Sequence, residues 1–188
     1  MPHDPYEKSK GHYFRYRKFS KVFYSNNKFE FIKENKFFQK KYNNRYAGGK
    51  IRVFKNIEPK VLVEFVNLFK NFFLNHFIRK KIEIGFHQLR IVCGKDFVGY
   101  PVPEGWHKDG FDYVVILNIA SKNIKGGITR IKDEIDSDHD VFSWFLRKGE
   151  YIFLYDHKYF HYTDPINVVG NYSKGSRDTL VITIKIKK

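Results

Sequence analysis

One segment of the chain, from Glu58 to Lys81, has apolar residues at helical spacing. Pro59 suits a first helical turn, and Lys80 and Lys81 lie where cations stabilise the last turn. Polar residues fill the opposite face, so the spacing predicts an amphipathic helix whose aromatic stripe belongs to the core. The stripe consists of Val61, Phe65, Leu68, Phe69, Phe72 and Phe73.

The pattern changes from residue 82 onwards, where short β-rich runs alternate with turn signals. The runs are IEIGFHQLRIVC, DYVVILNIA, GITRIKD, EYIFLYD, FHYTDPINVV and TLVITIKIK. Glycine-containing turns separate several of them, and no helical pattern lies between them. Several strands at this spacing predict an antiparallel sandwich or jelly roll.

The N-terminal part is less regular. Residues 1–27 are polar and aromatic, which predicts a basic, partly ordered arm. The run FEFIKENKFFQKKY within 28–46 suggests a short helix, and KIRVF (50–54) a short strand. The predicted class is therefore α+β, mainly β. A single domain would span 28–188, with a helical part over about 28–81 packed on a β core over about 82–188.

Composition narrows the class of protein. With 188 residues, of which 42% are hydrophobic, the chain is expected to form one domain with a real core. No apolar run reaches the length of a membrane span, and the first residues lack the pattern of a secretory signal. The single cysteine, Cys93, lies in the apolar run LRIVC and is expected to be buried. One cysteine cannot form an internal disulfide, so we expect a cytoplasmic location.

The net charge of +15 is concentrated in the N-terminal third. Residues 1–60 hold 16 Lys/Arg and 5 Asp/Glu, whereas residues 61–188 hold 19 and 15. A solvated basic face is one interpretation, and attraction of an anionic partner is the other. No nucleic-acid-binding motif is present, which disfavours nucleic acid as a partner but leaves it open.

The stretch PVPEGWHKDGFDYVVILNI (101–119) contains candidate metal ligands. On a strand, His107 and Asp109 would project from one face, and together they supply two thirds of a facial triad for iron(II). The run YDHKYFHYTDPI offers His157 and His161 as the third ligand. We favour His161 because it opens a β-rich segment, whereas His157 falls in the preceding turn.

A cation on the last predicted strand, RDTLVITIKIK, completes the pattern. Arg177 shares a strand face with Thr179. A guanidinium grips a carboxylate in two parallel bonds, which suits the far carboxylate of 2-oxoglutarate, and Thr179 could add a hydroxyl bond. Each of these features alone is more often structural, but their order along the chain favours a metal site.

Several segments resemble a known family. FHQLRI, PVPEGWHKDGFDYVVILNI, NIKGG, HYTDPI and RDTLVIT resemble the bacterial 2-oxoglutarate/iron(II) dioxygenases that include L-isoleucine 4-hydroxylase and related free-amino-acid hydroxylases. Gln39, the turn YNNRYAGG and the strand IRVF extend the resemblance over about 37–188. The resemblance implies a double-stranded β-helix (jelly roll, cupin-like). It also implies iron ligation by His107, Asp109 and His161, with Arg177 on 2-oxoglutarate.

The implied activity is hydroxylation of a C–H bond of a free L-amino acid or close derivative. Dioxygen and 2-oxoglutarate would be converted to succinate and CO2, with ascorbate as a supporting reductant. The partner would then be a small molecule. No prediction of the oligomeric state follows from the sequence.

Residues that would bind this substrate are less clearly marked. Gln88 and Arg90 share a strand face just upstream of the metal motif, and Arg90 is a candidate for the substrate carboxylate. Glu104 is a candidate for the ammonium group, and Trp106 for a wall of the pocket. The alternative interpretation is structural: Arg90 pairs with a structural carboxylate, Glu104 lies in a loop and Trp106 only packs.

Two other functions remain open on the sequence. The same chemistry on a peptide, tRNA or DNA is suggested by the basic N-terminal third. After Arg177, however, the chain offers only Lys185 and Lys187, where a nucleic-acid demethylase of this superfamily would be expected to carry a second arginine. The other alternative is a non-catalytic β-sandwich that acts as a binding module.

Overall fold

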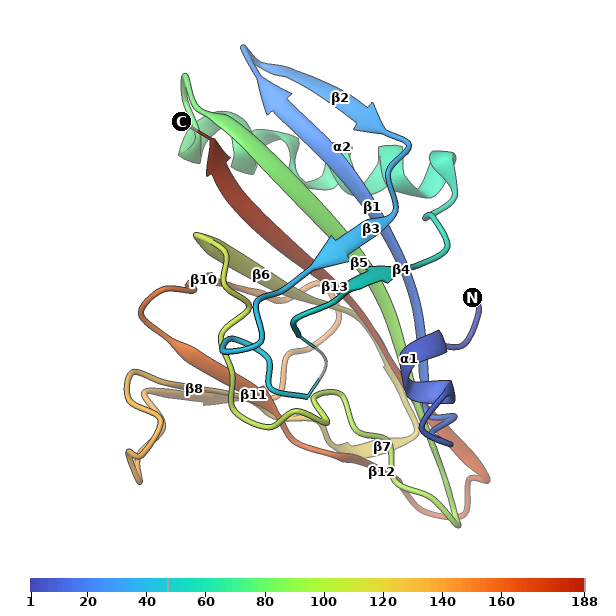
Figure 1. Cartoon of the computed structure of the whole chain (residues 1–188). Coiled ribbons are helices and arrows are strands. Elements are labelled where there is room, and N and C mark those ends of the chain that lie inside the picture. The colour runs from blue at the N-terminus through green and yellow to red at the C-terminus, as the bar shows by residue number, and fades with distance from the viewer. Residues whose placement is uncertain (47, 188) are drawn as a thin grey trace.

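The computed structural model describes residues 1–46 and 48–187, and it is mostly β (Figure 1). In chain order the elements are α1 (Pro5–Lys8), β1 (Arg15–Ser25), β2 (Lys28–Ile32), β3 (Lys36–Phe38), β4 (Ile51–Val53), α2 (Pro59–His76), β5 (Lys81–Gly94), β6 (Tyr113–Lys122), β7 (Ile124–Gly126), β8 (Thr129–Lys132), β9 (Phe142–Trp144), β10 (Tyr151–Tyr155), β11 (Phe160–Thr163), β12 (Ile166–Val168) and β13 (Lys174–Lys187). Among the described helices, none combines the length and the apolar character that a membrane span requires.

The strands form a jelly roll, as predicted. A six-stranded sheet has the order β10-β6-β13-β5-β1-β2, and all its neighbouring strands run antiparallel. A three-stranded sheet, β11-β8-β9, and the strand pairs β12-β7 and β3-β4 complete the fold. At the centre of the large sheet, β5 and β13 pair over the whole length of both strands.

Helix α2 covers one face of the large sheet. Its buried residues are Leu62, Val66, Phe69 and Phe73. They pack against the even-numbered side chains of the central strands, such as Ile84, Ile182 and Ile184. The predicted stripe is only partly right, because Leu68 is 64% exposed. The helix also ends earlier than predicted, at His76, and Lys81 begins β5.

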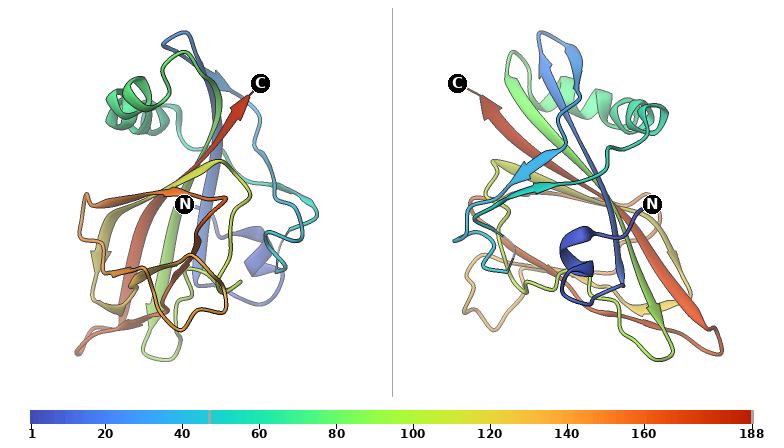
Figure 2. Two further views of the ribbon diagram at one scale, coloured as in Figure 1. Left: turned by 90° about the vertical axis from the view of Figure 1, so that its left-hand side faces the viewer. Right: turned by 45° about the vertical axis from the view of Figure 1, so that its right-hand side comes forward.

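The opposite face of the same strands lines an internal cavity. Since side chains alternate along a strand, His87, Leu89 and Ile91 of β5 point into this cavity. In the left view of Figure 2, α2 and the segment that carries β3 and β4 lie on opposite sides of the long strands. Phe37 and Phe54 from that segment pack against Phe19 of β1, which closes one side of the cavity.

The arm predicted over residues 1–27 is not an irregular segment in the structure. Residues 15–25 form β1, which pairs with β5 from Arg15 to Tyr24. The sequence of β1 lacks a simple alternation of apolar and polar residues, because this strand places both arginines and aromatic rings toward the interior. Arg15, Arg17 and Phe19 all face the cavity side and are buried.

The short helix predicted within 28–46 is wrong. The structure has strands β2 and β3 there, and β2 pairs with β1 as a hairpin. The turn consists of Asn26 and Asn27, which have φ values of 49° and 61°. Two consecutive residues with positive φ match the twist of a tight hairpin, and asparagine tolerates this conformation well. The pair Asn-Asn is thus the turn signal that the helical interpretation overlooked.

Candidate metal centre

The metal motif lies in the connection between β5 and β6, not on a regular strand as predicted. His107 forms one isolated β-bridge with His161 of β11. His107 N donates to His161 O at 3.2 Å, and His161 N donates to His107 O at 3.0 Å. Asp109 follows in irregular backbone. The two histidines therefore come together through a single pair of backbone hydrogen bonds between distant segments.

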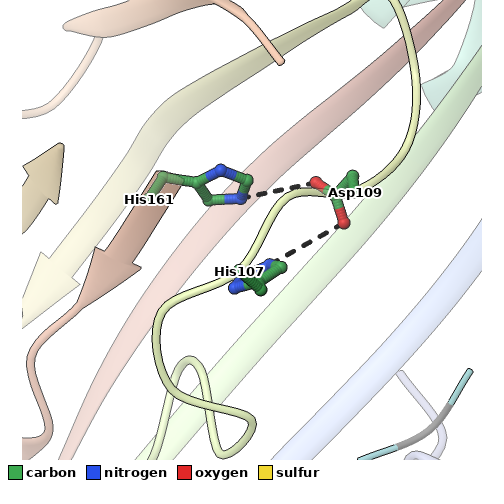
Figure 3. Close-up of side chains that lie close together, drawn as sticks. All are labelled: His107, Asp109 and His161. Atoms are coloured by element: carbon green, nitrogen blue, oxygen red, sulfur yellow. Dashed lines mark ion pairs between the residues drawn. The ribbon is translucent and has the colours of Figure 1, made fainter. Parts of the chain in front are cut away.

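His107, Asp109 and His161 form a compact cluster (Figure 3). One ligand atom from each residue lies within 4.8 Å of the others. His161 Nε2 is 3.4 Å from one carboxylate oxygen of Asp109, and His107 Nε2 is 3.8 Å from the other. His107 and His161 are only 8% and 4% exposed. This cluster could hold a metal ion.

Asp156, the residue directly after β10, holds the loop that carries Asp109. Its side chain is fully buried and accepts three backbone hydrogen bonds, from Asp109 N at 2.9 Å, Gly110 N at 2.6 Å and Phe111 N at 2.9 Å. Gly110 has a φ of 85°, and a Cβ there would lie 1.9 Å from Asn43 Nδ2. The loop therefore needs both the buried carboxylate and the glycine.

The orientation of both imidazoles suits metal binding. His107 Nδ1 lies 3.0 Å from Gly105 O and donates to it, which leaves Nε2 as the lone-pair atom that faces Asp109. His161 Nδ1 lies 4.0 Å from Asp156 Oδ1, and it has no hydrogen-bond partner among the described residues. Two imidazole nitrogens and one carboxylate are the donor set of the facial triad of non-haem iron(II) sites, so the residues fit that metal. Outer carboxylates and carbonyls that orient such ligands are common in metal sites.

The electrostatics of the metal-free cluster follow from close opposite charges. Burial disfavours the charged form of His161, but the hydrogen bond and charge of Asp109 outweigh this and raise its pKa. In Asp109, burial also opposes the charge, yet His161 and His107 lower the pKa of the carboxyl below its usual range. Burial and the nearby Asp109 raise the pKa of Asp156. The metal-free cluster therefore stabilises the ionised form of the Asp109 carboxyl group.

Arg177 and Thr179 line the same cavity, as the sequence predicted for neighbours on one face. Arg177 is 2% exposed and donates to Thr129 Oγ1 at 3.3 Å. Its Nε has no hydrogen-bond partner within the described part of the chain. Burial lowers the pKa of Arg177 to about 10, so it remains a cation at neutral pH. A buried guanidinium with spare donors is suited to bind a carboxylate.

His157, the alternative ligand, lies outside the cluster. Its Nε2 is 2.9 Å from Asp112 Oδ1, and about half of its side chain is exposed. Trp106 does not line the cavity either. Its ring packs against Tyr162 and lies under the ammonium group of Lys132.

The candidate substrate residues divide between two places. Gln88 and Arg90 alternate with the cavity-lining residues of β5, so their side chains project from the other face of the sheet. Arg90 forms a bidentate ion pair with Asp178, at 2.6 and 2.8 Å. The assignment of Gln88 and Arg90 to the substrate is therefore wrong, because the strand directs them away from the cavity. Glu104, in contrast, lines the cavity.

Several buried residues of the site carry no functional signal in the sequence. Arg15, Arg17, Arg52 and His87 line the cavity, Asp156 lies behind the Asp109 loop, and Gln39 is marked only by the family resemblance. Gln39 Nε2 donates to Asp109 Oδ1 at 2.6 Å, and its Oε1 accepts from Arg52. The alternation Arg15-x-Arg17 was the available signal, but inward-facing arginines on a strand cannot be told from solvated ones by sequence.

Comparison with known proteins supports the class that the fold and the cluster suggest. The family model described as 2OG-Fe dioxygenase matches residues 1–183. None of the curated proteins matches the chain. Among solved structures, a bsmA homologue from Methylobium petroleophilum PM1 has a TM-score of 0.75 and 25% identity, and the match covers 96% of this chain and 78% of that one.

Two further structures show the same fold. IDO from Bacillus thuringiensis has a TM-score of 0.75 and 22% identity over 93% of this chain and 79% of that one. The Fe(II)/(alpha)ketoglutarate-dependent dioxygenase TqaL has a TM-score of 0.64 and 15% identity over 93% of this chain and 68% of that one. With the family model spanning nearly the whole sequence, this chain belongs to the 2OG-Fe dioxygenase family. Membership in this family implies iron(II) as the metal cofactor and 2-oxoglutarate and dioxygen as co-substrates.

Proposed function

We propose that the protein hydroxylates an unactivated C–H bond of a free L-amino acid or a close derivative, with His107, Asp109 and His161 as the iron ligands. The carrying observation is that this cluster shares one buried cavity with Arg177 and with Glu104. Bound iron(II) would supply the oxidising chemistry, in which 2-oxoglutarate and dioxygen yield succinate and CO2 while one oxygen atom enters the substrate.

The protein's own residues position the reactants. Arg177, beside Thr129 and Thr179, would bind the far carboxylate of 2-oxoglutarate, since it is a buried cation without a carboxylate partner among the described residues. Gln39 would hold Asp109 in place through its short hydrogen bond. Asp156 would maintain the backbone that carries Asp109.

Glu104 supports an amino acid as the substrate. It lines the cavity, Asn44 donates to its Oε1 at 3.1 Å, and that oxygen lies 4.0 Å from His107 Nε2. The other oxygen, Oε2, is buried and has no hydrogen-bond partner among the described residues. Burial opposes ionisation, yet His107 and Arg15 lower the pKa of Glu104, so it is an anion at neutral pH. An ammonium group would satisfy this carboxylate.

A small molecule suits the site better than a macromolecule. His107 and His161 are buried, the Asp109 side chain is only 13% exposed, and a reacting carbon must enter the cavity to reach them. Part of the basic character of the N-terminal third also points inward, because three of the four arginines in residues 1–60 line this cavity. The charge excess therefore argues less for an external nucleic acid than the sequence suggested.

A substrate screen tests the proposal. The protein is incubated in air with iron(II), ascorbate, 2-oxoglutarate and a mixture of free amino acids, beside His107→Ala and the matched control His157→Ala. We expect succinate and an amino acid heavier by one oxygen with the wild type and with His157→Ala, but not with His107→Ala. Full activity of His107→Ala would refute the ligand assignment. Succinate without a hydroxylated amino acid would redirect the search to larger substrates.

A further inference from the structure

Three arginines form a second cationic wall of the cavity, separate from Arg177. Arg15 and Arg17 project inward from β1, and Arg52 projects from β4. In the large sheet, Arg15 and Arg177 both pair with Ile91, from opposite sides of β5. The two cationic walls thus lie on either side of the central strand, at a spacing of about two strand separations, or roughly 10 Å between backbones.

Among the described residues, Arg17 and Arg52 have no carboxylate at ion-pair distance. Arg17 Nη2 donates to His87 Nδ1 at 2.7 Å, and Arg52 donates to Gln39 Oε1, so both contact neutral groups. The Nε atoms of Arg17 and Arg52 have no hydrogen-bond partner in the part of the chain that the structure describes. Arg17 and Arg52 are 5% and 4% exposed, so both cations are buried. A buried cation is costly unless an anion pairs with it.

His87 cannot act as the missing anion or as a proton donor to one. Burial and the charge of Arg17 lower its pKa well below the usual value, so it is neutral. With Nδ1 accepting from Arg17, its Nε2 donates to Thr183 Oγ1 at 3.3 Å. His87 therefore orients the guanidinium of Arg17 without reducing its charge.

The neighbouring cations also repel one another. Burial, followed by the charges of Arg15 and Arg52, lowers the pKa of Arg17 to about 9. Burial and Arg15 likewise lower the pKa of Arg52. Within the described part of the chain, Arg15 is the one member of the wall with an acidic partner at ion-pair distance, its Nε lying 3.5 Å from Asp4 Oδ2. The charges of Glu104 and Asp4 act in the opposite direction on all three arginines, and all three are cations at neutral pH.

The wall is connected directly to the proposed iron site. Gln39 accepts from Arg52 and donates to Asp109, so one side chain links the wall to a proposed metal ligand. Both guanidinium groups contact the ring of Phe37, whose centroid is 5.2 Å from Arg17 Cζ and 4.9 Å from Arg52 Cζ. An anion held by these arginines would therefore keep its neighbouring carbons near the metal.

We propose that Arg15, Arg17 and Arg52 bind the two carboxylates of an amino acid with an acidic side chain, while Glu104 binds its ammonium group. The inference rests on the proposed function and names its substrate class. A neutral amino acid carries one carboxylate and one ammonium, so it offers a single carboxylate to Arg17 and Arg52, which contact only neutral groups through the hydrogen bonds described above. A dicarboxylic amino acid adds one net negative charge and enough oxygen acceptors for the spare guanidinium donors.

The test compares acids with their uncharged amides in the same protein. Wild-type protein is loaded with zinc(II) in place of iron and with 2-oxoglutarate, and binding of glutamate, aspartate, glutamine, asparagine and isoleucine is then measured by calorimetry. Loss of a charge-assisted hydrogen bond typically costs tenfold or more in affinity, so we expect glutamate or aspartate to bind at least about tenfold tighter than its amide. Equal affinity for acid and amide, or tighter binding of isoleucine, would overturn the inference.

Variants connect that preference to the wall. Arg17→Gln and, independently, Arg52→Gln should reduce the ratio of acid to amide affinity about tenfold. Arg45→Gln is the matched control, since Arg45 is an exposed arginine of the same third of the chain, and it should keep the ratio. If both wall variants are folded in thermal unfolding and still bind the acid more tightly than the amide, Arg17 and Arg52 do not bind the second carboxylate.

The loading step separates this inference from the proposed function. Failure of the protein to bind 2-oxoglutarate in the presence of zinc(II), together with no succinate in the iron(II) assay, would contradict the dioxygenase itself. Normal loading and succinate release, with no acid preference, would leave the dioxygenase in place and reject the acidic substrate alone.

Discussion

The two faces of the large sheet come from the same strands but have opposite chemistry. Toward α2, the strands present isoleucine, leucine and phenylalanine, which form the main apolar core. Toward the cavity, the alternate positions present arginine, histidine and threonine. The comparison is sharpest on β13, where Ile182 faces α2 and Arg177 faces the cavity. One face therefore stabilises the fold, and the other places cationic and polar side chains along the cavity.

This difference explains how a cavity with several buried cations is tolerated. Unpaired buried cations lower stability, and the jelly roll carries this cost because α2 buries a large apolar area behind the same strands. A variant on either face should therefore change a different property. Stability should depend mainly on the apolar face, and metal and ligand binding mainly on the cavity face.

The largest effect is expected on the apolar face. Ile182→Ala removes a fully buried side chain from the core under α2 and should reduce the free energy of unfolding by about 2–5 kcal/mol. Chemical denaturation measures this change, and zinc(II) affinity of the folded variant should stay close to that of the wild type. Leu68→Ala is the control on the exposed side of α2 and should change stability by less than about 0.5 kcal/mol. A large loss of metal affinity in Ile182→Ala would show that the two faces are not separable.

The next effect concerns the carboxylate behind the metal cluster. Asp156→Ala deprives three backbone N–H groups of their acceptor, which should loosen the Asp109 loop and reduce zinc(II) affinity about 10–100-fold. Asp156→Asn keeps one acceptor oxygen, so its zinc(II) affinity should lie between those of the wild type and Asp156→Ala. Calorimetric titration with zinc(II) provides the measurement. Unchanged affinity in Asp156→Ala would mean that the loop geometry does not depend on this residue.

The third effect is a stabilisation. Arg177→Met replaces a buried cation that has no carboxylate partner among the described residues, so the protein without 2-oxoglutarate should become more stable by about 1 kcal/mol. The same change should weaken 2-oxoglutarate binding about 10–100-fold, because a charge-assisted hydrogen bond is lost. Arg130→Met is the contrasting control, since Arg130 pairs with Asp140 and Asp164 and its loss should destabilise the protein. Thermal unfolding with and without 2-oxoglutarate measures both the stability and the ligand binding of each variant. Destabilisation of ligand-free Arg177→Met would contradict the interpretation that Arg177 is an unpaired, destabilising cation.

The smallest effect is a pH dependence of metal binding. The pKa of His161 is raised in the metal-free protein by Asp109, and a protonated imidazole cannot bind a metal. Zinc(II) affinity should therefore fall as the pH decreases through this raised pKa, by at most about tenfold per pH unit for one proton. The stability of the metal-free protein depends on pH in the opposite direction. The His161–Asp109 pair contributes stability below the ordinary histidine pKa and loses it as the pH rises through the raised value. A zinc(II) affinity that does not change between pH 8 and pH 6 would contradict the raised pKa.

Parts of the fold and of the candidate site could be read from the sequence because they depend on local pattern. The runs after residue 82 gave the β core, and the spacing of His107 and Asp109 suggested a metal site. The order of His161 and Arg177 behind them suggested the rest of the site, and all four residues line one cavity. Local pattern is ambiguous in the hairpin around Asn26 and Asn27, where the sequence predicts an arm followed by a helix and the structure has paired strands.

The sequence by itself determined which strands have two chemically different faces, since alternation along a strand fixes which side chains share a side. Only the tertiary structure decided what each face meets. It directed Arg17 and Arg52 inward and Arg90 outward, although all three are arginines on strands. It also brought His161 against His107 through one backbone bridge, and set Asp156 under the loop of Asp109. These contacts join segments about 50 residues apart, and such pairings depend on the packing of whole sheets, which no short stretch of sequence encodes.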